Sequence, residues 1–90
     1  MKESTIEAYL LKRVKALGGE CRKVNFPGHL GAPDRFVLLP GHTPVWVELK
    51  SPTGRLTPAQ VREHVRLCKM GETVITLRSK EEVDAWLKTL

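Results

Sequence analysis

Cysteine and long apolar runs are both scarce in this sequence of 90 residues. Cys21 and Cys68 form no CxxC pair, and no Cys/His cluster has the spacing of zinc ligands. A disulfide framework and a structural zinc site are therefore not indicated. No apolar segment approaches the length of a signal-peptide core or a membrane span. We therefore expect a cytoplasmic protein with free thiols and no membrane partner, in a bacterial-type or virus-infected cell.

Negative charge is also in short supply. Fifteen Lys and Arg against ten Asp and Glu give a formal net charge of +5. Such a field attracts polyanions, so nucleic acid is the first candidate partner, although a few extra lysines also serve plain solubility. We see no linker, repeat or low-complexity stretch, and this length favours a single domain over residues 1–90 with one modest core.

Helix and strand signals alternate along the chain. Three segments start with a hydroxyl residue followed three positions later by Glu or Gln, the signature of a capping box: Ser4 with Glu7, Thr57 with Gln60, and Ser79 with Glu82. They predict helices over about residues 5–17, 58–70 and from 80 onward. Runs rich in β-formers predict strands at 20–26, 36–39, 45–50 and 73–77. The short connection at 40–43 predicts that the second and third strands pair antiparallel, in an α/β protein.

Two charged side chains share one face of the predicted strand at 45–50. Residues two apart on a strand point the same way, so Glu48 and Lys50 lie together while Val47 and Leu49 point into the core. Asp34 precedes the neighbouring strand, and pairing can bring it close to Glu48.

Adjacent carboxylates repel each other unless a cation lies between them. Mg²⁺ prefers carboxylate and carbonyl oxygens and retains several waters, so Asp34, Glu48 and the main-chain carbonyl of Leu49 form a candidate metal site. Lys50 would orient the attacking water or offset developing charge, which suits phosphodiester hydrolysis. Taken singly, a Pro-Asp pair often opens a turn and Glu-x-Lys is often a solvated strand face. Taken together and in this order, the three residues favour catalysis.

Three segments resemble the motifs of the VRR-NUC nucleases, a branch of the PD-(D/E)xK superfamily: Gly31 to Asp34, Glu48 to Lys50, and Gly54 to Gln60. The resemblance covers nearly the whole chain. It implies a restriction-endonuclease-like αβββαβ core, with a mixed central sheet flanked by helices, plus a C-terminal helix. It also implies that Glu7 joins the catalytic site as a metal ligand and that Gln60 positions the attacking water or Lys50. The competing interpretation gives Glu7 and Gln60 only capping roles.

Basic residues could follow a phosphate backbone. Arg62, Arg66 and Lys69 recur at helical spacing, and Arg55 lies in the preceding loop. An ordinary solvated helix face is the alternative, since no aromatic residue is interleaved for base stacking. A second candidate patch, equally open, lies near the first loop: Arg22, Lys23, His29 and Arg35.

Histidine and tryptophan have weaker functional interpretations. His29, His42 and His64 lack metal-ligand spacing, and only His64, one turn after Gln60, is considered as a substrate contact. Trp46 shares the strand face of Glu48, so it walls the site or packs under the first helix. We favour core packing for Trp46 and Trp86.

The resemblance and two-fold symmetry together imply a particular substrate. They predict a Mg²⁺- or Mn²⁺-dependent, structure-selective DNA endonuclease that acts as a homodimer on four-way (Holliday) junctions or cruciforms, without a small-molecule cofactor. No base-reading element is visible, which argues against a fixed DNA sequence. The alternatives are a flap, nick or restriction-like nuclease, and a non-catalytic basic DNA-binding module on a nuclease fold.

Overall fold

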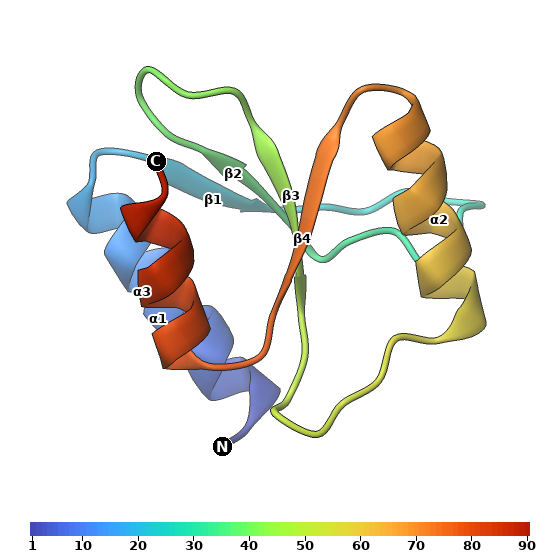
Figure 1. The fold of residues 1–90 in the computed structure, drawn as a ribbon, viewed down its shortest axis with the longest axis horizontal. Helices are drawn as coiled ribbons and strands as arrows, with labels where there is room; N and C mark the ends of the chain where they lie inside the picture. Colours follow the sequence, from blue (N-terminus) through green and yellow to red (C-terminus); the bar gives the residue numbers. More distant parts are fainter.

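A four-stranded mixed sheet organises the chain, and a computed structural model describes all of residues 1–90 (Figure 1). The strands lie in the order β1 (Glu20–Lys23), β2 (Arg35–Leu38), β3 (Val45–Leu49) and β4 (Thr73–Leu77). The helices are α1 (Glu3–Ala16), α2 (Pro58–Lys69) and α3 (Lys80–Lys88). β1, β2 and β3 pair antiparallel, and β4 joins β3 parallel. The expected αβββαβ core with a C-terminal helix is confirmed. None of the three helices is long and apolar enough to cross a bilayer.

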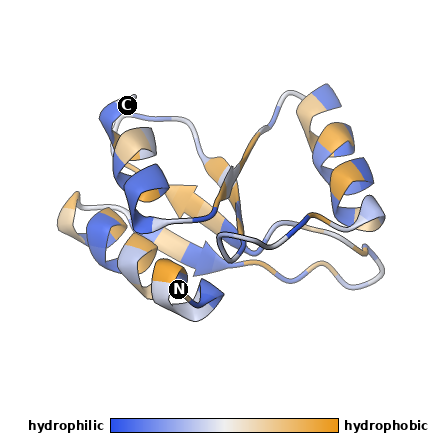
Figure 2. Ribbon diagram, turned by 60° about the horizontal axis from the view of Figure 1, so that its bottom comes forward, coloured by the Kyte–Doolittle hydropathy of each residue, from blue (hydrophilic) through white to orange (hydrophobic).

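The apolar core lies on one face of this sheet. Figure 1 shows α1 and α3 together on that face, with α2 on the other. Residues at helical spacing on α1 (Ile6, Leu10 and Val14) are fully buried there against the alternate residues Val47 and Leu49 of β3. In Figure 2, several strand segments between the helices are coloured as hydrophobic. The period-two pattern of β3 therefore sends Val47 and Leu49 into the core, as predicted.

The face under α2 is more polar. Its buried side chains include Glu48 from β3, and Glu63, His64 and Leu67 from α2. Beside them the rings of Phe36 and Phe26 pack on Trp46, with centroids 4.4 and 5.4 Å away. The Trp46 indole also donates to Glu72, 2.9 Å away.

Packing of Trp46 under the first helix was a wrong expectation. Strand alternation puts its ring on the face opposite to Val47, and α1 covers the face of Val47. Trp86 packs against the main core, as favoured.

Two of the three predicted helix starts have the expected caps. Thr57 and Gln60 form a reciprocal capping box, and Ser79 accepts from the Glu82 N–H at 3.0 Å. The Ser4 cap was wrong: α1 begins at Glu3, after Lys2, and no side chain caps it. Without that cap, Glu7 is free to bond elsewhere.

The first strand is shorter than the predicted 20–26. It ends at Lys23, which pairs with Arg35, and one further bond joins the Val24 N–H to the Asp34 carbonyl. Pro33 precedes Asp34 and has no N–H, so it cannot extend the ladder.

Candidate active site

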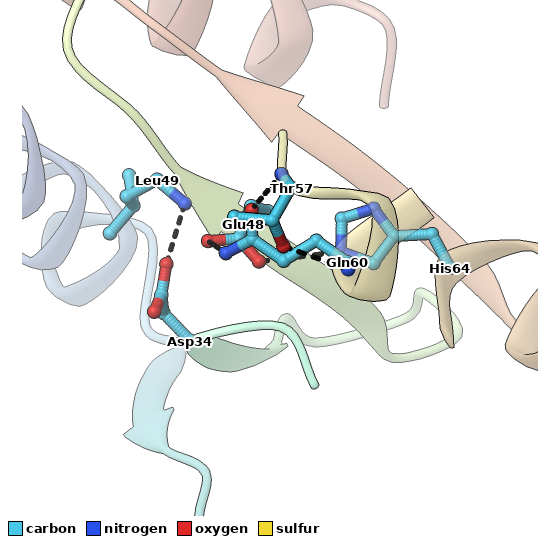
Figure 3. Close-up of polar contacts among 6 residues, drawn as sticks. All are labelled: Asp34, Glu48, Leu49, Thr57, Gln60 and His64. Atoms are coloured by element: carbon cyan, nitrogen blue, oxygen red, sulfur yellow. Dashed lines mark hydrogen bonds and ion pairs between the residues drawn. The ribbon is translucent and has the colours of Figure 1, made fainter. Parts of the chain in front are cut away.

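Asp34 and Glu48 face each other across neighbouring strands. The register pairs Arg35 with Val47, which puts Asp34 opposite Glu48 on the α2 face of the sheet. The Leu49 N–H donates to Asp34 Oδ2 at 2.9 Å and fixes that carboxylate (Figure 3). Glu48 itself is only 1% exposed. The predicted approach of these two carboxyl groups, from strands expected to adjoin, is present in the structure.

Helix α2 contacts both oxygens of the Glu48 carboxyl. Gln60 Nε2 donates to Oε2 over 3.4 Å, and His64 Nε2 lies 3.3 Å from Oε1. Figure 3 shows both side chains reaching Glu48 from α2. Gln60 Oε1 also accepts from the Thr57 N–H at 2.9 Å, so Gln60 is a capping residue and a contact of Glu48 at once. The two interpretations weighed for Gln60 are therefore compatible in geometry.

Burial perturbs the acidity of this cluster. The pKa of Glu48 rises from 4.5 to about 9, first because burial disfavours its charge, then because Asp34 bonds to it and repels it. The Lys50 ammonium opposes this rise. Burial also lowers the pKa of His64, against the pull of Asp34 and Glu63. Two carboxyl groups held so close retain a proton unless a cation replaces it.

The donor set fits a hard divalent cation in part. Asp34 and Glu48 offer carboxylate oxygens, but no group of three His, Cys, Asp or Glu side chains is placed to hold an ion. The Leu49 N–H points toward Asp34, and in an extended strand the carbonyl of the same residue points to the same side. Two carboxylates, one carbonyl and water are the ligands that Mg²⁺ accepts.

Glu7 is not brought to this pair. Arg35 Nε donates to Glu7 Oε2 at 3.0 Å, and Arg35 follows Asp34, so its side chain lies on the opposite face of the sheet. Its guanidinium also donates to the Cys21 carbonyl and is only 13% exposed. The structure thus gives both side chains partners within the protein, and Glu7 does not form a group of three possible metal ligands with Asp34 and Glu48.

A glycine lets the loop before Asp34 touch α2. Gly31 has φ +85°, and a Cβ there would lie 2.5 Å from the carbonyl oxygen of Ala59 and 2.7 Å from the nitrogen of Gln60. Only glycine tolerates both that backbone conformation and that approach. Gly31 therefore sets the distance between the loop that carries Asp34 and the helix that carries Gln60.

Most of the predicted nucleic-acid contacts are exposed. Arg55, Arg62, Arg66 and Lys69 lie on the surface, the last three on α2. A groove of about 370 Å³ lies between α2 and the loop before β2, and it is lined by Gly28, Leu30, Ala59, Arg62, Glu63 and Arg66. Arg66 Nε donates to Glu63 Oε1 at 3.0 Å. Of the guanidinium groups of Arg62 and Arg66, that of Arg62 is therefore the more available to a phosphate.

The sequence did not predict two influences on Glu48. His64, considered only as a substrate contact one turn after Gln60, contacts Glu48 directly. Among the acidic residues of α1, Glu3 is the one whose charge raises the pKa of Glu48. It lies one turn before Glu7.

Comparisons with known proteins point to a nuclease family. No protein-family model matches the chain. A protein of Acyrthosiphon pisum secondary endosymbiont phage 1, named "Putative nuclease p44", is 42% identical over 81 residues, or 90% of this chain and 87% of the relative. A solved structure described as "VRR_NUC domain" superposes with a TM-score of 0.89 at 37% identity, covering 98% of this chain and 96% of that one.

Proposed function

Because this chain belongs to the VRR-NUC family of nucleases, we propose that it hydrolyses phosphodiester bonds in DNA at Asp34, Glu48 and Lys50, with Mg²⁺ or Mn²⁺. One observation carries the proposal. Asp34 and Glu48 are held together on one sheet face, where burial, and then the neighbouring Asp34, raise the pKa of Glu48 to about 9. A buried carboxyl pair of this kind is costly unless the site uses it.

The metal would be held by Asp34, Glu48 and the Leu49 carbonyl, and it supplies charge stabilisation on a phosphate oxygen and a more acidic bound water. The protein does the positioning. Asp34 is fixed by the Leu49 N–H, and Glu48 by Gln60 and His64. Metal-binding side chains that are already fixed need no reorganisation during the reaction. Such preorganisation is how active sites gain most of their rate.

Lys50 has the role of a mobile positive charge. It shares the strand face of Glu48, and its charge lowers the pKa of Glu48. No acidic side chain forms an ion pair with it, which leaves its ammonium available to orient the attacking water or to offset charge on the phosphate. Gln60 Nε2 contacts the Glu48 carboxyl group and can also hold the attacking water.

The DNA backbone would run along α2. Arg62, Arg66 and Lys69 lie on its exposed side, and Arg55 lies in the loop just before the helix. Arg62 and Arg66 line the groove beside α2. Ala59 lines it too, and Ala59 precedes Gln60, which contacts Glu48. Phosphates bound there would therefore lie close to the carboxyl pair. Arg35 does not belong to this surface, because its guanidinium is bonded to Glu7.

We further propose a branched substrate and a two-fold dimer. These 90 residues present one candidate site and show no base-reading element, which favours selectivity by shape. Two sites related by a two-fold axis would match the paired strands of a four-way junction.

The test compares cleavage of a four-way junction, a flap and a linear duplex by the wild type, Lys50→Ala and Asp34→Ala. Mg²⁺, Mn²⁺ and EDTA are each tried, and light scattering gives the mass. We expect the wild type to be a dimer that cleaves the junction only when metal is present. Both variants should lose this cleavage but still bind DNA. Equal cleavage in EDTA would falsify the metal mechanism. Preferential cutting of the flap or the linear duplex would replace the proposed substrate. Binding without cleavage under any metal would make the protein a DNA-binding module.

A further inference from the structure

His64 is a buried polar side chain beside the carboxyl pair. It is 9% exposed and lies on the inner face of α2 with Gln60, one turn earlier. Its Nε2 is 3.3 Å from Glu48 Oε1, while Gln60 Nε2 is 3.4 Å from Oε2. One helix therefore contacts both oxygens of a single carboxyl group.

This double contact restricts how the carboxyl group can turn. A glutamate has three side-chain torsions, and the last one, which orients the carboxyl plane, is soft. One partner on each oxygen fixes that plane, whereas Gln60 alone would hold a single oxygen. Gln60 is itself tied to the Thr57 N–H, so the helix start anchors half of the contact.

The surroundings leave His64 few other roles. The charged groups that face it are Asp34, Glu63 and Lys50, in addition to Glu48 itself. His64 contacts Glu48 Oε1 and does not form a group of three possible ligands with Asp34 and Glu48, which favours a role as a partner of Glu48 over a role as a metal ligand. Partners of this kind behind a metal ligand commonly change metal affinity or activity about 10- to 100-fold when they are lost.

We propose that His64 is a positioning residue of the active site, which fixes the Glu48 carboxylate for the metal by donating from Nε2 to Oε1. This inference rests on the proposed function, since it concerns the same metal. It assigns to α2 a second contribution besides Gln60. His64 itself touches neither the substrate nor the reacting atoms.

Two amides of different reach give the sharpest test. In His64→Gln the amide nitrogen lies as many bonds from Cα as Nε2 does, whereas in His64→Asn it is one bond short. Both variants are polar and neutral, so both satisfy a polar site. Mn²⁺ affinity is measured by calorimetry without DNA, followed by kcat and KM on a four-way junction and by thermal unfolding.

We expect His64→Asn to weaken Mn²⁺ binding and to lower kcat, each about tenfold, with KM for DNA little changed. His64→Gln should recover most of both losses. The exposed His42→Gln serves as the matched control and should behave as the wild type.

Equal Mn²⁺ affinities in the Gln and Asn variants would overturn the inference, as would losses that follow only the unfolding temperature. A wild type that binds Mn²⁺ with the expected order of variants, yet cuts no DNA, would sink the proposed function and keep this one. A wild type that binds no Mn²⁺ would sink both.

Discussion

Replacing Glu48 by glutamine should change how stability depends on pH. Glutamine keeps the shape of the protonated glutamic acid and can still bond to Asp34, but it cannot ionise. The wild-type carboxyl is 1% exposed, and its pKa is raised from 4.5 to about 9 by burial and by Asp34. The stabilities of the two proteins should therefore diverge with pH only in the pH range in which the Glu48 carboxyl ionises on unfolding.

The sign follows from which state holds the proton. Between about pH 4.5 and pH 9 the folded wild type keeps its proton and the unfolded chain loses it, so rising pH favours unfolding. This contribution to stability is fully present below about pH 4.5 and is lost progressively as the pH rises to about 9. Above about pH 9 it no longer changes with pH. One pH unit corresponds to about 1.4 kcal/mol, so raising the pH from about 5 to about 8 should cost the wild type roughly 4 kcal/mol relative to Glu48→Gln. That is a large part of the roughly 5 to 13 kcal/mol expected for a domain of this length.

Urea unfolding in EDTA, followed by circular dichroism at several pH values, measures the difference directly. The wild-type curve should fall below that of Glu48→Gln as the pH rises, and Mn²⁺ should reduce the gap, because a cation replaces the proton. Parallel curves in EDTA would refute the reasoning, since they would mean that Glu48 ionises on this sheet face as freely as it does in water.

Three further changes test other parts of the molecule. Gly31→Ala should reduce both stability and cleavage, because its Cβ would lie 2.5 Å from a carbonyl oxygen of α2. Gly28→Ala is the control, since Gly28 has a similar φ but no atom within 4 Å of the added Cβ. It should lower the free energy of unfolding only by the backbone strain, about 1 kcal/mol. Leu10→Ala should lower the free energy of unfolding by roughly 2 to 5 kcal/mol, whereas Leu30→Ala, at an 85% exposed site, should change it by less than about 0.5 kcal/mol. Glu7→Gln should leave Mn²⁺ affinity unchanged in calorimetry, and a loss of about tenfold would return Glu7 to the metal site.

Local patterns predicted much of the fold. The alternation of Val47, Glu48 and Leu49 was enough to separate a core face from a site face, because strand geometry leaves no third direction. The Thr57 and Gln60 pair located the start of α2, because a capping box is completed within four residues. Predictions of this kind need only neighbours in the chain, which the sequence displays.

Contacts between distant residues could not be predicted in the same way. Glu7 bonds to Arg35, 28 residues away, and this pairing replaced the cap expected at Ser4. It depends on how α1 lies on the sheet, which no local pattern fixes. Trp46 differs, because strand alternation alone already put it on the face of Glu48 and ruled out packing under α1.

The division between the two faces of the sheet explains how a small domain can afford a buried charge cluster. On the α1 and α3 face, ten buried apolar side chains form one continuous core. On the α2 face, the buried groups next to the site are Glu48, Glu63 and His64, which gain little from the hydrophobic effect. The capping box at Thr57 and the close approach at Gly31 then hold α2 in place from its first turn. A change that loosens that turn should therefore weaken Mn²⁺ binding before it unfolds the protein, whereas a change in the core should lower both together.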